Sequence, residues 1–305
     1  MTGEDVQITC DDVQKDRQRL RSERQIVYFC SMNKLNRTQL LPDRPGIPPM
    51  AKMPDPETID ISALADSYAK GEIDLICVLG PTASGKTRYA VQLAKAIGKE
   101  IKGKAEILSA DSRQVYRGMD IGTGKDLAEY GDVPYHLIDI VPAGAKFNIY
   151  QYQAAFAKAY ADVRSRGAVP ILCGGSGLYI EAVTRAYKFD KENGMDPSFL
   201  PQRTYYIGTL VSREERVARI DRRLQERLQE GMVDEIRTLL KTVPSADLIY
   251  YGLEYKFVTQ YVMGELSYDD MVISLGNAIH QFAKRQMTWF RGMERDGLKI
   301  HWTKP

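Results

Sequence analysis

The stretch from Leu75 to Thr87 constrains the fold more than any other part of the chain. Its sequence, LICVLGPTASGKT, is an apolar run followed by a glycine-spaced turn and the start of a helical pattern. Gly80 and Gly85 let backbone N–H groups face an anion, Lys86 supplies positive charge, and the threonine hydroxyl reaches a Mg²⁺ ion. The helix adds the positive end of its dipole. The stretch therefore predicts a strand, a diphosphate-binding loop and a helix, without identifying the phosphate ester.

The composition is that of a soluble globular protein. The chain has 305 residues, of which 44% are hydrophobic, which is enough to bury the core of one large α/β domain. No apolar run is long enough to span a bilayer, and the acidic N-terminus lacks the features of a signal or transit peptide. We therefore expect a cytoplasmic monomer with no membrane partner. The net charge of +2 is too small to indicate a nucleic-acid partner by itself.

Residues 1–70 are predicted to form a disordered N-terminal extension. Six prolines between Pro42 and Pro56 oppose regular structure. The charged segment 15–24 mixes acidic residues with its arginines, which is more typical of a solvated helix than of a nucleic-acid-binding arm. The folded domain is expected over residues 71–305.

From residue 73 onward, short apolar segments alternate with segments of helical periodicity. This alternation predicts an α/β fold like that of the P-loop NTPases, with a mostly parallel sheet, flanking helices and a helical C-terminal part. Strands are expected at 73–79, 105–109, 135–140, 169–173, 204–211 and 298–302, and helices at 86–97 and 150–166.

A long helix predicted after residue 212 has two distinct faces. Val217, Ile220 and Leu224 begin an apolar series with three- and four-residue steps, which is expected to pack inward. Arginines share another face, at positions 216, 219, 223 and 227. Such a stripe is more typical of a solvated face, and the alternative is a lid that clamps phosphates.

Two further strand ends are expected to meet the loop. In an open α/β sheet, ligands gather at the carboxyl ends of the strands, so Asp111 should lie beside the phosphate loop. There it would hold Mg²⁺ or accept a proton from a nucleophile, and the alternative is a helix cap. Cys173 is followed by a glycine turn with Ser176, which is a weak signal alone but gains weight from its place at a third strand end.

Five motifs together resemble the dimethylallyl (isopentenyl) transferase family, which modifies adenine N6 and is best known from tRNA-modifying enzymes. The motifs occur in the family's order, at 80–87, 109–123, 134–140, 174–179 and 283–291. The resemblance implies a nucleotide-binding or ATP-binding type of loop that is used for transfer of an allyl group. Dimethylallyl diphosphate would be the donor, and Mg²⁺ the cofactor.

The resemblance also implies roles for individual residues. Catalysis is assigned to Asp111 as the base, with Lys86 and Thr87 stabilising the leaving group, and the metal to Thr87 and Asp111. The donor diphosphate is assigned to Gly80, Thr82, Ala83, Ser84, Gly85, Lys86, Thr87 and Arg285. The substrate is assigned to Ser112, Arg113, Gln114, Lys125 and Ser176. For Arg285, a packing or surface role beside two aromatic residues is an equal alternative.

This chain departs from the family pattern in three places. His280 replaces a diphosphate-binding arginine, so either a protonated His280 or an arginine of the stripe is expected to take its place. The pattern Gly-Thr-Ala-Lys-Pro becomes Gly-Thr-Gly-Lys-Asp at 122–126. The helical insertion that grips the anticodon stem-loop is largely missing, because only residues 186–202 separate the helix of the 174–179 motif from the next predicted strand.

The acceptor is therefore left between alternatives. Adenosine in tRNA, at position 37 next to the anticodon, is the first, and a free adenine nucleotide (AMP, ADP or ATP), as in cytokinin synthesis, is the second. A tRNA enzyme needs an open basic channel for a flipped-out base, whereas a nucleotide enzyme needs a closed cationic pocket. A P-loop kinase is the outsider.

Overall fold

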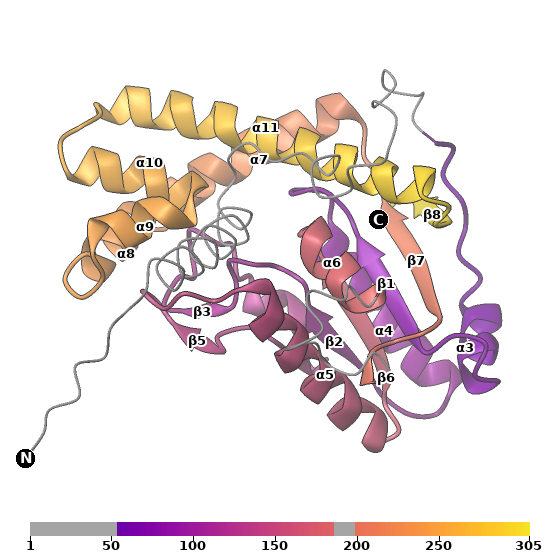
Figure 1. Ribbon diagram of the computed structural model, residues 1–305. Coiled ribbons are helices and arrows are strands. Elements are labelled where there is room, and N and C mark those ends of the chain that lie inside the picture. Colours follow the sequence, from indigo (N-terminus) through magenta and orange to yellow (C-terminus); the bar gives the residue numbers. More distant parts are fainter. Residues whose placement is uncertain (1–53, 186–198) are drawn as a thin grey trace, which may run out of the picture.

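A six-stranded parallel sheet forms the centre of the molecule, which we describe from a computed structural model covering residues 54–185 and 199–305 (Figure 1). The strand order is β4-β2-β6-β1-β7-β8, and every pairing is parallel. The strands are β1 (Leu75–Leu79), β2 (Ala105–Ser109), β4 (Tyr135–His136), β6 (Val169–Gly174), β7 (Thr204–Thr209) and β8 (Ile300–Thr303). The predicted mostly parallel α/β sheet is confirmed.

Helices cover both faces of this sheet. All of β1 is buried, as expected of a central parallel strand without polar alternation. Leu75, Cys77 and Leu79 pack with α5 (Ile149–Ser165) and α6 (Gly177–Thr184). Ile76 and Val78 pack on the other face with α3 (Ile61–Ala69) and α4 (Lys86–Glu100).

A helical part with its own core lies beyond the carboxyl ends of the strands (Figure 1). Its helices are α7 (Arg213–Gln229), α8 (Met232–Leu239), α9 (Ser245–Tyr251), α10 (Leu253–Val262) and α11 (Tyr268–Arg295). Short elements connect it to the sheet, namely β3 (Tyr116–Arg117), β5 (Val141–Pro142) and the 3₁₀ turn η1 (Leu127–Tyr130). None of the helices in the described ranges is long and apolar enough to cross a membrane.

Two expectations change when the structure is compared with the sequence. The strand expected at 135–140 ends at His136, because Leu137 and Asp139 adopt positive φ values that turn the chain. The extension expected to be disordered up to residue 70 contains α3, whose Asp60 caps the helix and whose Leu64 is buried. Residues 1–53 of that extension lie outside the described residues. Residues 185–203 separate α6 from β7. Of these, residues 186–198 also lie outside the residues that the structure describes.

Candidate active site

The carboxyl ends of three adjacent strands, β2, β6 and β1, form one side of a pocket that we call the central pocket. Lys86 and Thr87 reach it from the loop after β1, and Asp111 reaches it from the loop after β2. The end of β6 contributes Cys173 and Gly174. The structure thus brings together the three strand-end motifs that the sequence singled out.

The loop after β1 is held in shape by close packing. A side chain at Gly80 would place its Cβ 2.1 Å from the Thr209 hydroxyl oxygen, so only glycine fits. The Ser84 hydroxyl hydrogen-bonds that of Thr209 at 2.7 Å and is buried, so Ser84 supports the loop instead of lining the pocket. Gly85 has φ of +79° at the start of α4. The loop therefore leads directly into the N-terminus of α4, where free backbone N–H groups can bind an anion.

Lys86 and Thr87 are the first two residues of α4, and Thr82 joins them in lining the central pocket. Ala83 and Gly85 line the adjoining outer groove, which also includes Arg219 and Arg222. Burial lowers the pKa of the Lys86 ammonium. An anion bound beside the ammonium would oppose this shift and stabilise the charged form.

Asp111 is fixed by its own loop. Its Oδ1 accepts the backbone N–H of Arg113 at 3.0 Å, and Oδ2 accepts no hydrogen bond within the described part of the chain. The backbone N–H of Ser112 donates to the Ser176 hydroxyl at 3.1 Å, and the two hydroxyls are 3.2 Å apart. Ser112 and Ser176, which the resemblance assigned to the substrate, therefore tie the β2 loop to the β6 turn and are not among the residues that line the central pocket.

Arg113 and Gln114 both line the central pocket, as the sequence predicted. Arg113 Nη1 donates to Glu254 Oε2 at 2.5 Å, and the guanidinium lies over the Phe282 ring. Burial lowers the pKa of Arg113, but the charges of Glu254 and Asp111 outweigh this and raise the pKa. Gln114 Nε2 donates to the Gly124 carbonyl at 3.1 Å.

Lys125, which the resemblance assigned to the substrate, is not among the residues that line the central pocket. Its ammonium is fully buried and donates to the Tyr116 carbonyl at 2.5 Å and to Asp120 at 2.8 Å, with a third bond to Asp139. All three of its protons are thus used inside the protein. Lys125 holds the loop between β3 and β5 together.

The α11 motif contributes a residue other than the one predicted. Arg285 is exposed and is not among the residues that line the central pocket, whereas Gln286 is buried and lines it. Gln286 Oε1 accepts the Thr82 N–H at 2.8 Å, and its Nε2 donates to the Gly175 carbonyl at 3.0 Å. It therefore fastens two of the three loops. The available signal was a polar residue on the apolar stripe of α11.

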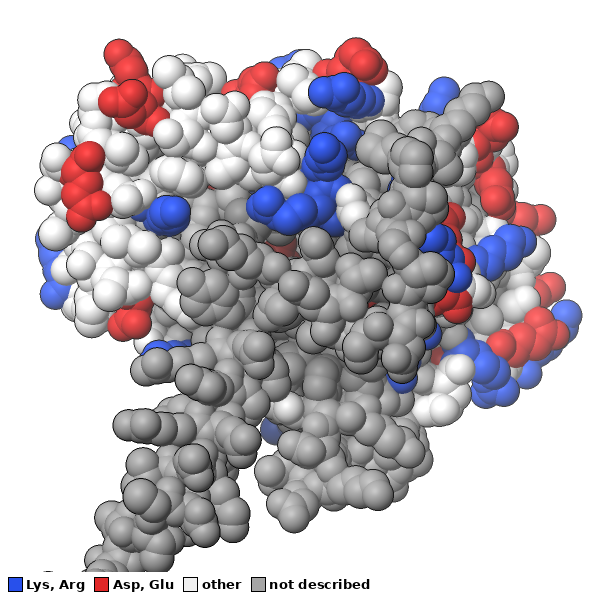
Figure 2. All heavy atoms as spheres, turned by 45° about the horizontal axis from the view of Figure 1, so that its top comes forward, with Lys and Arg blue, Asp and Glu red and all other residues white. Residues whose placement is uncertain are grey.

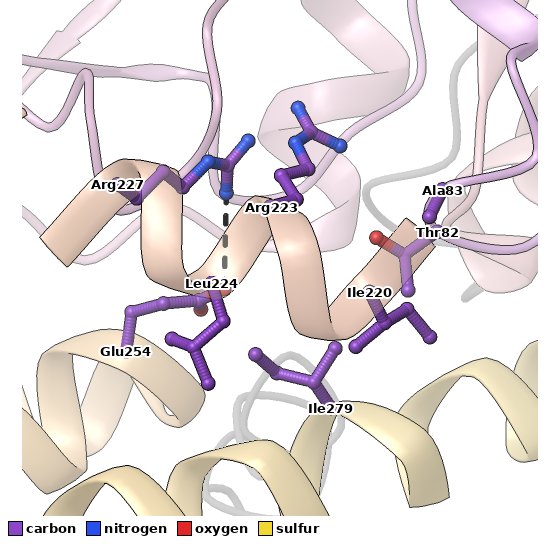
Figure 3. A pocket seen from close by; sticks show the side chains of 8 residues that line it. All are labelled: Thr82, Ala83, Ile220, Arg223, Leu224, Arg227, Glu254 and Ile279. Carbon is purple, nitrogen blue, oxygen red and sulfur yellow. Dashed lines mark ion pairs between the residues drawn. The ribbon is translucent and has the colours of Figure 1, made fainter. Parts of the chain in front are cut away.

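Part of the arginine stripe on α7 faces the pocket rather than solvent. Arg223 and Arg227 line the central pocket and also a smaller side pocket with Ile220, drawn in Figure 3. His280, by contrast, pairs with Asp221 at 2.7 Å and lines none of the three pockets described above. The preference for a solvated stripe is thus wrong at these two positions, because sequence periodicity does not tell which helix face meets the sheet.

Fold and site together define an α/β protein with a glycine-spaced loop at the carboxyl edge of a parallel sheet. The sequence matches the IPP transferase family over residues 114–198 and 189–293. The chain belongs to this family. The match divides in two within the segment between α6 and β7, where the sequence predicted that the family's insertion is missing.

Named relatives and solved structures agree with this membership. The tRNA dimethylallyltransferase 1 of Parabacteroides distasonis is 46% identical, with 75% of this chain and 92% of the relative covered. The tRNA dimethylallyltransferase 2 of Syntrophotalea carbinolica is 44% identical, with 75% and 93% covered. The crystal structure of a tRNA isopentenylpyrophosphate transferase from Bacillus halodurans superposes with a TM-score of 0.64 at 28% identity, covering 76% of this chain and 89% of that one.

Proposed function

We propose that this protein transfers a dimethylallyl group from dimethylallyl diphosphate to the N6 amine of an adenosine in tRNA, next to the anticodon. The observation that carries the proposal is the meeting of Lys86, Thr87 and Asp111 in one pocket of an IPP transferase family member. Relatives named tRNA dimethylallyltransferase support tRNA as the acceptor.

The loop stabilises the leaving group in this proposal. The donor's diphosphate lies on the loop, with the Lys86 ammonium beside it. The bond between C1 of the dimethylallyl group and the diphosphate oxygen breaks, and pyrophosphate leaves with that electron pair. A bond from the adenine N6 to C1 forms. Negative charge grows most on the departing oxygen, so a fixed cation there lowers the barrier. Because His280 points elsewhere, Arg223 takes the role of the family arginine.

Asp111 accepts the proton that N6 loses. The exocyclic amine is a poor nucleophile because its lone pair is delocalised into the ring, so a carboxylate that accepts its N–H orients it and removes the proton. Oδ1 of Asp111 already accepts the Arg113 N–H, and Oδ2 is the oxygen left for the amine.

The residues present also fit a Mg²⁺ ion. This ion takes one or two protein oxygens and otherwise binds water and substrate phosphates. Thr87 and Asp111 both offer oxygens to the central pocket. When bound, the ion would neutralise part of the diphosphate charge.

The charge of the outer face supports a polyanionic acceptor. Basic side chains gather on the face that α7 and α11 form (Figure 2). On α7, burial lowers the pKa of the half-buried Arg216, and the positive charges of Arg213 and Arg291 lower it further against the opposing charge of Glu214. Like charges at this spacing repel one another unless an anion lies between them, and the phosphates of tRNA supply such anions.

The test is a split assay with a catalytic variant. Purified protein with Mg²⁺ and dimethylallyl diphosphate is offered unmodified tRNA in one tube and AMP, ADP and ATP in another, and the digested products are weighed by mass spectrometry. Asp111→Asn should lower kcat by about 10²- to 10⁴-fold and keep the donor KM, because the amide still accepts the Arg113 N–H. Asp234→Asn, an exposed change on α8, is the control.

Each outcome has a defined meaning. Prenylated adenosine from tRNA alone supports the proposal, and a prenylated free nucleotide alone replaces tRNA by an adenylate acceptor. Phosphoryl transfer from ATP without prenyl transfer would indicate a kinase. Normal turnover by Asp111→Asn would show that Asp111 is not the base.

A further inference from the structure

Two guanidinium groups from α7 converge on one glycine at the central pocket. Arg223 and Arg227 lie one turn apart and point the same way from α7 (Figure 3). A Cβ atom at Gly124 would lie 1.6 Å from Nη2 of Arg227 and 2.5 Å from Nη2 of Arg223. Gly124 has φ of +65° and no side chain, and it therefore leaves the space that the Arg227 guanidinium fills. The family pattern has alanine here.

Arg223 has a carboxylate partner, but Arg227 has almost none. Arg223 Nη2 lies 2.7 Å from Asp126 Oδ2. The carboxylate that faces Arg227 belongs to Glu254, whose Oε1 lies 4.0 Å from Arg227 Nη1. The other oxygen of this carboxylate, Oε2, pairs with Arg113. Nη2 of Arg227 is buried and has no hydrogen-bond partner among the described residues. The residue as a whole is 9% exposed.

This state of Arg227 is energetically unfavourable unless an anion is bound. Burial and the neighbouring charge of Arg223 lower the pKa of Arg227 to about 10, so the group is still protonated at neutral pH. A buried cation without hydrogen bonds destabilises a fold. A bound anion would explain the arrangement, because it would supply the hydrogen-bond acceptor and the negative charge that Arg227 lacks.

We infer that Arg227 is a direct ligand of the donor's diphosphate, and hence of the pyrophosphate product, together with the loop after β1. The inference rests on the proposed function. Arg227 lines the same pocket as Lys86 and Thr87, and its unpaired Nη2 carries two N–H donors that can bind phosphate oxygens. Glu254 is then a positioning residue, which holds Arg113 and Arg227 on opposite sides of one carboxylate.

The test uses inorganic pyrophosphate with Mg²⁺ as the probe, measured by isothermal titration calorimetry. Arg227→Met keeps most of the side-chain volume and should raise the pyrophosphate Kd by about 10- to 100-fold, as expected for hydrogen bonds to a charged group. The same variant without ligand should unfold at the same temperature as the wild type or higher, because an uncompensated charge is removed. A merely structural arginine would lower that temperature and leave Kd unchanged.

Matched variants complete the test. Arg237→Met removes an exposed arginine on α8 that pairs with Asp234, and it should leave Kd unchanged. Gly124→Ala should displace Arg227 and weaken pyrophosphate binding, and adding Arg227→Met to it should cause little further loss, because both changes remove one contact. If Arg227→Met fails to fold, Arg227→Lys decides, since it keeps the charge and loses the fork, and should weaken binding to a smaller extent.

The two proposals fail in different ways. An unchanged Kd in the folded Arg227 variants would overturn the inference, while prenyl transfer to tRNA by the wild type would leave the proposed function intact. Tight pyrophosphate binding that depends on Arg227, without any prenyl transfer, would overturn the function and leave Arg227 as an anion ligand.

Discussion

Replacing Gln286 by methionine tests whether α11 holds the two phosphate-side loops together. The wild-type amide makes two hydrogen bonds, accepting the Thr82 N–H at 2.8 Å and donating to the Gly175 carbonyl at 3.0 Å. Methionine has a similar volume and makes neither bond, and it leaves a backbone donor and a backbone acceptor unpaired. At about 1–2 kcal/mol for each, the free energy of unfolding should fall by about 2–4 kcal/mol.

Urea denaturation gives this free energy, provided that the dependence on denaturant concentration stays the same in both proteins. Gln281→Met, an exposed change on the same helix, should alter the free energy by less than about 0.5 kcal/mol. The donor KM of the Gln286 variant should also rise, because the loop that binds the diphosphate loses its fastening. A Gln286 variant as stable as its Gln281 counterpart would show that water or other groups pair the two backbone atoms.

Three further predictions concern charge. Burial raises the pKa of Glu106, but hydrogen bonds from His136 and Arg166 outweigh this and lower the pKa below 4.5. The ionised Glu106 therefore stabilises the folded state above pH 4.5, and this stabilisation is lost as pH falls through the folded pKa. Glu106→Gln should thus lower the thermal midpoint at pH 7 and change it little in strong acid. A decrease of the midpoint that is equal at the two pH values would contradict this. His280→Arg should leave the donor KM unchanged in steady-state assays, because position 280 points to Asp221; a lower KM would place it at the donor. Lys86→Met should raise the pyrophosphate Kd in calorimetry. It should also raise the thermal midpoint of the protein measured without ligand, because burial disfavours the lysine charge. A pyrophosphate Kd equal to that of the wild type would exclude Lys86 from the anion site.

Local sequence signals predicted the part of the site that depends on short-range geometry. The loop at 80–87 follows a fully apolar run, and both its glycines are needed by the contacts described above. Asp111 lies at a strand end, where topology alone directs it to the crevice. Such features need only the strand order and the backbone conformation of a few residues.

The remaining site residues depend on contacts between distant segments. Lys125 lies in a motif beside the site, but Asp120 and Asp139 turn its ammonium inward. Arg227 comes from the arginine face of a predicted helix and Gln286 from the 283–291 motif, and nothing in their spacing tells that these two side chains meet the pocket. Polar residues on otherwise apolar helix stripes are the signal to look for in such chains.

Helix α11 belongs to both cores of the molecule without a break. Its first half packs in the helical part through Met271 and Leu275, and its second half packs on the sheet through Phe290 and Met293. A continuous helix is stiff along its axis, so the two cores are joined by a rod instead of a hinge. A movement of one core toward the other would therefore have to bend α11 itself. Gln286, in the second half of this helix, would carry such a bend directly to the two loops that it holds.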